Sequence, residues 1–176
     1  MTISPEYLEQ QKRLHENPNY GVVSLKFAPL AIDFAQKVGA KSISDYGAGK
    51  KNLFKRMKEL GHGGYDYRPY DPAFPEYGPA RPGDLVCCLD VLEHIEPDFL
   101  DEVLDELQRI TEKVGLFSIH TGPAGKVLDD GRNAHLIQKP ASWWPPRLCA
   151  RFEISHMQRM PGGFWVVVER GGTAAS

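Results

Sequence analysis

The chain has 176 residues, of which 41% are hydrophobic and 25% charged, and its formal net charge at pH 7 is −2. This length and composition fit one globular domain and exclude a fibrous or intrinsically disordered protein. Proteins that bind nucleic acids through their phosphates usually carry a basic surplus. Because positive and negative charges nearly cancel here, the sequence gives no strong signal for nucleic-acid binding.

Cysteine usage and hydropathy indicate the compartment. Cys87 and Cys88 are neighbours inside an apolar run and lack the spacer between the ligands of a metal-binding pair, so we predict buried free thiols and no metal site. Residues 1–16 contain no apolar signal-peptide core, and no stretch is long enough to span a bilayer. We therefore expect a cytoplasmic protein that does not associate with membranes.

Two helices are expected before the first strand. Ser4 suits the N-cap of a helix over residues 5–15, and residues 17–21 are typical of a turn. Apolar residues then recur at helical intervals up to Gly39, which predicts a second helix with a glycine at its end. We expect these elements to form an N-terminal helical cap over residues 1–40.

Strand-like and helix-like segments alternate in the rest of the chain, up to residue 170. The expected strands cover residues 41–46, 64–71, 84–89 and 114–120, and the expected helices cover 51–60, 97–112 and 140–150. Pro161-Gly162-Gly163 predicts a hairpin between two further strands, 152–160 and 164–169.

This alternation predicts an α/β fold: a doubly wound, mainly parallel sheet with helices on both faces and an antiparallel C-terminal hairpin strand. Pro69 places the second strand near an edge of that sheet, because proline cannot donate to a strand ladder. Residues 171–176 are expected to form a flexible tail.

Three motifs follow the ends of predicted strands. Asp45-Tyr46-Gly47-Ala48-Gly49 joins a strand to a helix, where glycines let the backbone approach a ligand and the helix offers free N–H groups. Asp71-Pro72 ends the next strand, where an acid can accept hydrogen bonds from both hydroxyls of a ribose, although an Asp-Pro turn explains it as well. Asp90-Val91-Leu92-Glu93-His94-Ile95 follows a buried strand, at the end where open α/β sheets bind ligands.

In this order and on these elements, the three motifs resemble the class I S-adenosylmethionine-dependent methyltransferase family, over about residues 42–170. The resemblance implies a single Rossmann-like methyltransferase domain over residues 1–176, with S-adenosyl-L-methionine as its cofactor. The cofactor-binding residues that it implies are Asp45, Gly47 and Gly49 for the methionine moiety, Asp71 and Pro72 for the ribose, Asp90, Val91 and Leu92 for the wall beside the sulfonium, and Tyr20 for a lid.

One feature departs from the family pattern. Only about 12 residues separate Asp71 from Asp84, which is too few for a crossover helix, a third strand and their loops. We therefore expect the third strand and its crossover helix to be reduced or missing, together with the adenine contacts that they usually provide.

Candidate catalytic residues are His135, Arg132 and His94. An imidazole with an ordinary pKa near 6.5 can take a proton from an oxygen or nitrogen acceptor, and Arg132 could pair with an anionic group of the acceptor. The resemblance implies that His94 faces the pocket or braces its rim. A histidine that only stabilises its loop is the structural alternative for His135. The acceptor is expected to be a small molecule or a nucleotide.

Two other functions stay open. A non-catalytic S-adenosylmethionine-binding or partner subunit would carry the same motifs, and the small size of the chain suits it. An NAD-binding oxidoreductase is disfavoured because Asn52 stands where its fingerprint needs a third glycine. Gly49-Lys50-Lys51 lacks the hydroxyl of a phosphate-binding loop. The sequence makes no prediction of the oligomeric state.

Overall fold

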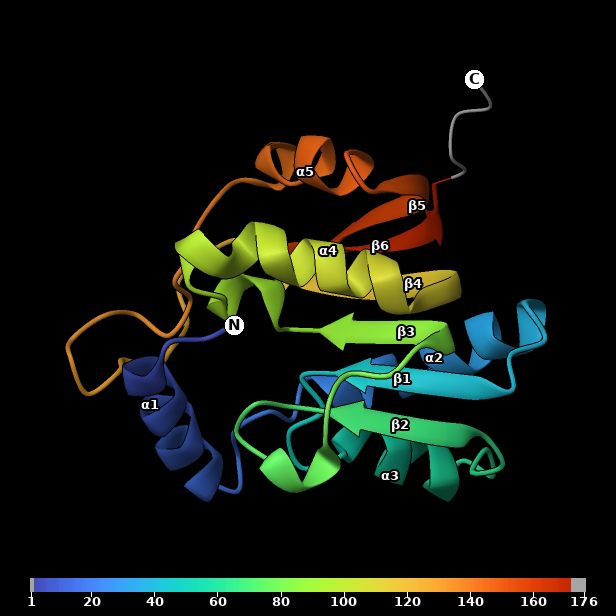
Figure 1. Cartoon of the computed structure of the whole chain (residues 1–176), viewed down its shortest axis with the longest axis horizontal. Coiled ribbons are helices and arrows are strands. Elements are labelled where there is room, and N and C mark those ends of the chain that lie inside the picture. Colours follow the sequence, from blue (N-terminus) through green and yellow to red (C-terminus); the bar gives the residue numbers. More distant parts are fainter. Residues whose placement is uncertain (1, 172–176) are drawn as a thin grey trace.

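A six-stranded sheet with the order β2-β1-β3-β4-β6-β5 organises the protein, as shown by a computed structural model that describes residues 2–171 (Figure 1). The strands are β1 (Ser42–Tyr46), β2 (Asp66–Tyr70), β3 (Gly83–Leu89), β4 (Thr111–His120), β5 (Phe152–Met160) and β6 (Gly163–Arg170). Strands β2, β1, β3 and β4 run parallel, whereas β6 is antiparallel to both β4 and β5. The predicted fold class is therefore confirmed, and the expected tail lies, apart from Gly171, outside the described residues.

Helices cover both faces of the sheet (Figure 1). They are α1 (Pro5–Glu16), α2 (Ser24–Lys37), α3 (Asn52–Glu59), α4 (Leu100–Ile110) and α5 (Pro145–Cys149). On one face, Phe27 of α2 and Leu53 of α3 pack with Leu85 of β3. On the other face, α4 and α5 bury their apolar stripes against β3, β4 and β6, with Trp144 fully buried among them. Burial of these two layers supplies the main driving force for folding.

The helix expected at 97–112 and the strand expected at 114–120 divide differently in the structure. Residues 97–99 form a 3₁₀ turn, α4 ends at Ile110, and β4 begins at Thr111 with no intervening loop. The Thr111 hydroxyl donates to the Leu107 carbonyl at 2.7 Å, which satisfies an otherwise free group at the helix end. Gly83 pairs with Thr111 and draws it into the sheet.

As expected from the short segment between Asp71 and Asp84, the described residues contain no additional strand between β2 and β3. After β2 the chain makes only a 3₁₀ turn at Pro75–Tyr77 before it enters β3. Strand β2 therefore lies at the edge of the sheet, as Pro69 predicted.

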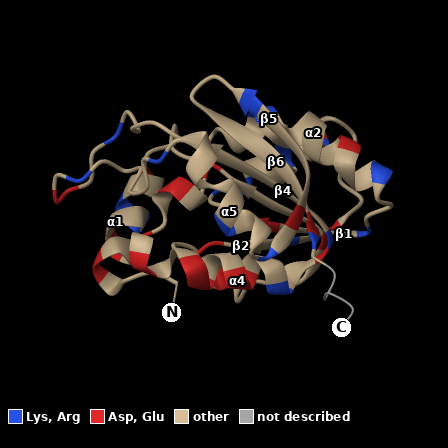
Figure 2. Ribbon diagram, turned by 90° about the horizontal axis from the view of Figure 1, so that it is seen from above, with Lys and Arg blue, Asp and Glu red and all other residues tan. Residues whose placement is uncertain are grey.

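Only α1 covers the ends of the strands, although we expected a helical cap over the whole of residues 1–40. Tyr7 of α1 packs with Leu128 and Ala134 of the loop that follows β4, in a small cluster separate from the two main layers. Helix α2 instead packs on the sheet. Figure 2 shows Lys and Arg spread over several elements, whereas Asp and Glu gather along α4. None of the helices within residues 2–171 is long and apolar enough to cross a membrane.

Candidate active site

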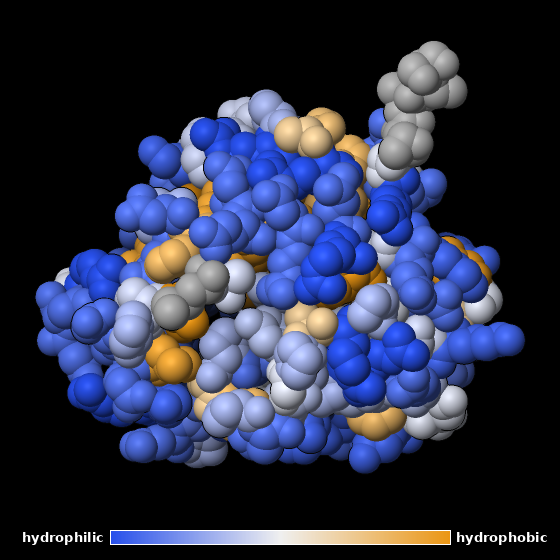
Figure 3. All heavy atoms as spheres, viewed as in Figure 1, coloured by the Kyte–Doolittle hydropathy of each residue, from blue (hydrophilic) through white to orange (hydrophobic). Residues whose placement is uncertain are grey.

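A cavity of about 990 Å³, measured out to its open mouth, lies between α1 and the carboxyl ends of β1, β2 and β3. In Figure 1 the arrowheads of these strands point towards α1, and Figure 3 shows apolar atoms exposed at this end of the molecule. Open α/β sheets bind their ligands at this position.

The glycine turn forms the floor of the cavity. Gly47 has a φ of +78°, and a Cβ built on it would lie 2.4 Å from a methyl carbon of Val91. The N–H groups of Gly47 and Ala48 both donate to the Tyr70 carbonyl, at 2.8 and 2.9 Å. Glycine is therefore required at residue 47 by both backbone conformation and space, and the end of β2 fixes the turn.

Asp71 ties the same turn to the end of β2. Its Oδ2 accepts from the Gly49 N–H and its Oδ1 from the Ala73 N–H, each at 2.9 Å. Burial raises the pKa of this carboxyl, and the two N–H donors oppose that shift. Asp71 and the neighbouring Pro72 both line the cavity, so the carboxylate can accept further hydrogen bonds from a ligand.

Asp45 is a second buried acid on the cavity wall, and it is only 3% exposed. Burial raises its pKa to about 7, although the Tyr67 hydroxyl donates to its Oδ2 at 2.5 Å and favours the charged form. A carboxyl in this state gains by pairing with a cationic ligand group, because such a group stabilises the ionised form.

The loop after β3 supplies the opposite wall. Asp90 has a φ of +61°, which is uncommon for a residue other than glycine, and its N–H donates to the carbonyl and hydroxyl oxygens of Ser118 at 3.1 and 3.0 Å. Asp90 and Val91 line the cavity. Leu92 does not line it, and its side chain is fully buried in the core under α4. The structure thus brings two of these three predicted residues together in the wall.

Two of the predicted catalytic residues lie ring to ring. His94 lines the cavity, and the centroid of its ring lies 4.7 Å from that of His135, which stands behind it and outside the cavity lining. Nδ1 of His94 lies 2.8 Å from the Ala134 carbonyl oxygen, and Nδ1 of His135 lies 2.7 Å from the Gly122 carbonyl oxygen. Because a carbonyl only accepts, Nδ1 donates in both contacts, which leaves Nε2 of each ring for other partners. Burial lowers the pKa of His94 to about 4, which keeps this ring neutral.

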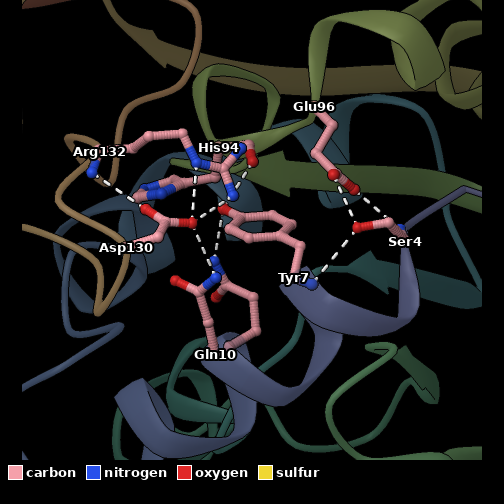
Figure 4. A network of polar contacts seen from close by, with 8 residues as sticks. Ser4, Tyr7, Gln10, His94, Glu96, Asp130 and Arg132 are labelled. Carbon is pink, nitrogen blue, oxygen red and sulfur yellow. Dashed lines mark hydrogen bonds and ion pairs between the residues drawn. The ribbon is translucent and has the colours of Figure 1, made fainter.

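Arg132 does not reach the cavity. Its guanidinium pairs with Asp130 at 2.7 Å and lies over the ring of Tyr7, 5.8 Å from the centroid (Figure 4). The Tyr7 hydroxyl in turn donates to the His94 carbonyl at 2.7 Å. The structure therefore places Arg132 against Tyr7 of α1, where it supports a residue of the cavity wall instead of facing a ligand.

The sequence interpretation missed the cavity residues of α1, which are Tyr7, Gln11 and His15. They recur every four residues and so share one face of the helix, a spacing that could have marked them. Tyr20 also lines the cavity, and its hydroxyl donates to Gln11 Oε1 at 3.2 Å. His15 packs edge-on against Tyr20 and Phe74, and burial, helped by the positive charge of Lys50, lowers its pKa to about 4.

No protein-family model matches this sequence, and a search of curated proteins finds no match. Solved structures do match. A 1,6-didemethyltoxoflavin-N1-methyltransferase from Burkholderia thailandensis, with 1,6-didemethyltoxoflavin and S-adenosylhomocysteine bound, is 15% identical with a TM-score of 0.68, over 97% of this chain and 92% of that chain. The N-methyltransferase NodS from Bradyrhizobium japonicum WM9, in complex with S-adenosylhomocysteine, is 9% identical with a TM-score of 0.59, over 95% and 98% of the two chains.

A third structure, the complex of DhpI with S-adenosylhomocysteine, is 17% identical with a TM-score of 0.59, over 96% of this chain and 99% of that chain. These likenesses extend over nearly the whole length of the proteins. The chain therefore has the fold of the class I S-adenosylmethionine-dependent methyltransferases, as the order of its three motifs predicted.

Proposed function

We propose that the protein is a methyltransferase that uses S-adenosyl-L-methionine and methylates an oxygen or nitrogen atom of a small molecule or nucleotide. The observation that carries the proposal is the meeting of Asp45, Gly47, Asp71 and Asp90 in one cavity at the carboxyl ends of three parallel strands. The three similar structures described above were solved with S-adenosylhomocysteine, which is the product of this cofactor.

The donor groups of the cavity match the polar groups of such a cofactor. Asp45, buried beside the glycine turn, would pair with the α-ammonium of the methionine moiety. Asp71 would accept from the two ribose hydroxyls, because each of its oxygens keeps a lone pair beyond its backbone bond. The space that a side chain at Gly47 would fill lets the ligand approach the backbone closely.

The chemistry requires little more than positioning. When bound, the cofactor supplies a methyl group on a sulfonium. The neutral thioether that remains after the transfer is a good leaving group. The chain holds the acceptor in line with that group and takes up the proton that the acceptor loses. His94 is placed for the second task, since it lines the cavity and the hydrogen bond of its Nδ1 to the Ala134 carbonyl leaves Nε2 to accept the proton. His135 would act by orienting His94 through their ring contact.

Calorimetric titration with S-adenosylmethionine and S-adenosylhomocysteine tests the cofactor site. We expect both to bind wild type, and Asp71→Asn to bind each at least about 10-fold more weakly, because the loss of a charge-assisted hydrogen bond costs about 1.5–3 kcal/mol. Asp84→Asn is the matched control: Asp84 also accepts from two backbone N–H groups, those of Lys41 and Ser42, but it lies outside the cavity lining. Absence of binding in wild type, or equal losses in both variants, would overturn the proposal.

Turnover separates an enzyme from a binding subunit. We expect wild type to release S-adenosylhomocysteine in the presence of a library of hydroxyl-bearing and amine-bearing acceptors, and His94→Gln to bind the cofactor with unchanged affinity but to turn over at least about 100-fold more slowly. Cofactor binding without turnover on any acceptor would instead assign a non-catalytic role.

A further inference from the structure

Three side chains with metal-ligating atoms converge at the wall of the cavity, two of them lining it and the third lying behind. One ligand atom each from Asp90, His94 and His135 lies within 4.8 Å of the other two. Asp90 and His94 come from the loop after β3, and His135 comes from the loop after β4, which the sheet brings alongside. The sequence separation between His94 and His135 explains why no spacing pattern predicted a metal site here.

Both imidazoles are held as metal-binding histidines are held. In metal sites, the ring nitrogen that does not bind the ion usually donates to a carbonyl or carboxylate, which fixes the tautomer and aims the lone pair of the other nitrogen. The Ala134 and Gly122 carbonyls accept from Nδ1 of His94 and His135 in this way. Each carbonyl belongs to the loop after β4, so one loop orients both rings. A single proton acceptor would need only one such ring.

The backbone that carries the third ligand, Asp90, is fixed as well. The two hydrogen bonds from the Asp90 N–H to Ser118 hold this residue at its positive φ. Glu93, in the same loop, is fully buried, and its Oε1 accepts from the His120 N–H at 2.5 Å, which ties the loop after β3 to the end of β4.

We propose that Asp90, His94 and His135 bind one divalent transition-metal ion at the wall of the cavity. Two imidazoles and one carboxylate form a ligand set that suits such ions and leaves coordination positions open. Two ligand atoms bound at about 2.1 Å and at a tetrahedral angle lie about 3.4 Å apart, so the ligand atoms, which lie within 4.8 Å of one another, would have to approach by at most about 1.4 Å to close the site.

The position of the site indicates the class of acceptor, an inference that rests on the proposed methyltransferase function. Asp90 and His94 line the same cavity as the cofactor residues, so an ion there has its open positions in the cavity. Such an ion would bind oxygen ligands and lower the pKa of a bound hydroxyl, so that the hydroxyl loses its proton to solvent at neutral pH and becomes an alkoxide or phenolate. With the ion bound, Nε2 of His94 would be a metal ligand and the ion would replace it in activating the acceptor. We infer that the acceptor is an oxygen compound with two adjacent oxygen atoms able to chelate the ion.

Titration of the tag-free, EDTA-stripped chain with Co²⁺, followed by visible absorption and calorimetry, tests the metal site without any turnover. We expect one Co²⁺ per chain. Asp90→Asn and His135→Gln should each weaken its binding by at least about 100-fold, since each removes a direct ligand and loss of outer-shell partners already costs 10-fold to 100-fold. Asparagine tolerates positive φ, so Asp90→Asn keeps the backbone of the loop.

His156→Gln is the matched control, because His156 is exposed on β5 and its ring contacts that of Trp165, away from the cluster. It should bind Co²⁺ as wild type does. Circular dichroism checks that every variant is folded. Absence of stoichiometric Co²⁺ binding by wild type, or equal binding by wild type and both ligand variants, would overturn the metal site.

Two further titrations keep this proposal separate from the methyltransferase proposal. S-adenosylhomocysteine is titrated into the EDTA-stripped chain: if it fails to bind while Co²⁺ binds, the methyltransferase function falls and the metal site stands. With protein in excess over Co²⁺, catechol should shift the absorption bands of the bound ion and phenol should not. Equal spectra with the two compounds would overturn the chelating class of acceptor.

Discussion

The two rims of the cavity are built in different ways. On the strand rim, hydrogen bonds with the backbone near the ends of β1 and β2 fix the ligand-facing groups, as where Gly47 donates to Tyr70 and Asp71 accepts from Gly49. On the helix rim, α1 is attached by side chains, including Ser4, whose hydroxyl donates to Glu96 at 2.7 Å, and Arg13. The strand rim therefore cannot move without breaking the sheet, whereas the helix rim can. We therefore expect the first to set the geometry of a bound ligand and the second to control access to it.

The largest effect is expected on the strand rim, from Gly47→Ala. A methyl group there meets Val91 and adopts an unfavourable φ, so we expect the free energy of unfolding to fall by about 2–4 kcal/mol and S-adenosylhomocysteine binding to fall by at least about 100-fold. Gly39→Ala is the control, because Gly39 also has a positive φ but no atom within 4 Å of the added carbon. It should cost about 1 kcal/mol and leave binding unchanged. Equal effects in thermal unfolding and calorimetry would show that the contact with Val91 is unimportant.

A pH dependence is the next largest effect. Because burial raises the pKa of Asp45 to about 7, the ionised form that pairs with an ammonium is scarce below that pH. We expect the affinity for S-adenosylhomocysteine to rise about 10-fold per pH unit up to pH 7 and then to level off. Tyr67→Phe removes the hydrogen bond that favours the charge, so its midpoint should move to higher pH. A profile that is the same in Asp45→Asn and wild type would assign the dependence to another group.

The same raised pKa affects stability. Between the unfolded pKa of Asp45, near 3.9, and its folded value of about 7, the folded chain holds a proton that the unfolded chain has lost. Protonation of Asp45 therefore stabilises the folded chain fully below about pH 4, and this stabilisation is lost as the pH rises through 7. Urea unfolding at a series of pH values should show wild type losing stability over this window relative to Asp45→Asn. Parallel curves would contradict the assignment.

A smaller effect is expected on the helix rim. Glu96→Ala removes the acceptor of both the N–H and the hydroxyl of Ser4, at the start of α1. We expect a loss of about 1–2 kcal/mol in unfolding free energy and about 10-fold faster dissociation of S-adenosylhomocysteine, with hydrogen exchange in the sheet unchanged. Stopped-flow displacement and exchange mass spectrometry measure the two quantities. Faster exchange in β1 and β3 would show that the two rims are not separable.

The smallest effect is expected from Arg13→Ala. The ion pair of Arg13 with Asp129 joins two side chains that are each more than 60% exposed, at 62% and 63%. Exposed pairs of this kind contribute at most about 0.5–1 kcal/mol, and salt screens them. Unfolding free energy and ligand dissociation should both stay close to wild type. A change as large as that of Glu96→Ala would mean that α1 is held mainly by charge.

The sequence predicted the strand rim far better than the helix rim. Glycine turns and buried strands leave a local pattern, and the length of chain between Asp71 and Asp84 revealed the missing strand. Contacts between residues that are distant in the sequence leave no such pattern: Ser4 and Glu96, which form a hydrogen bond, are 92 positions apart. Arg132 pairs with Asp130, only two residues away, which removed it from the cavity. Leu92 was misplaced because the direction of its side chain depends on a 3₁₀ turn, Leu92–His94, that the sequence pattern did not show.

The edge position of β2 has a consequence for contacts between chains. A sheet that lacks its third strand presents a row of backbone groups at β2 to any other strand that approaches, which invites aggregation. Pro69 offers no N–H there, and Arg68 next to it turns back to pair with Asp66 at 2.6 Å. A proline and a charged pair on so short a strand make a poor template for another strand. The shortened fold thus carries, within β2 itself, a safeguard against edge-to-edge association.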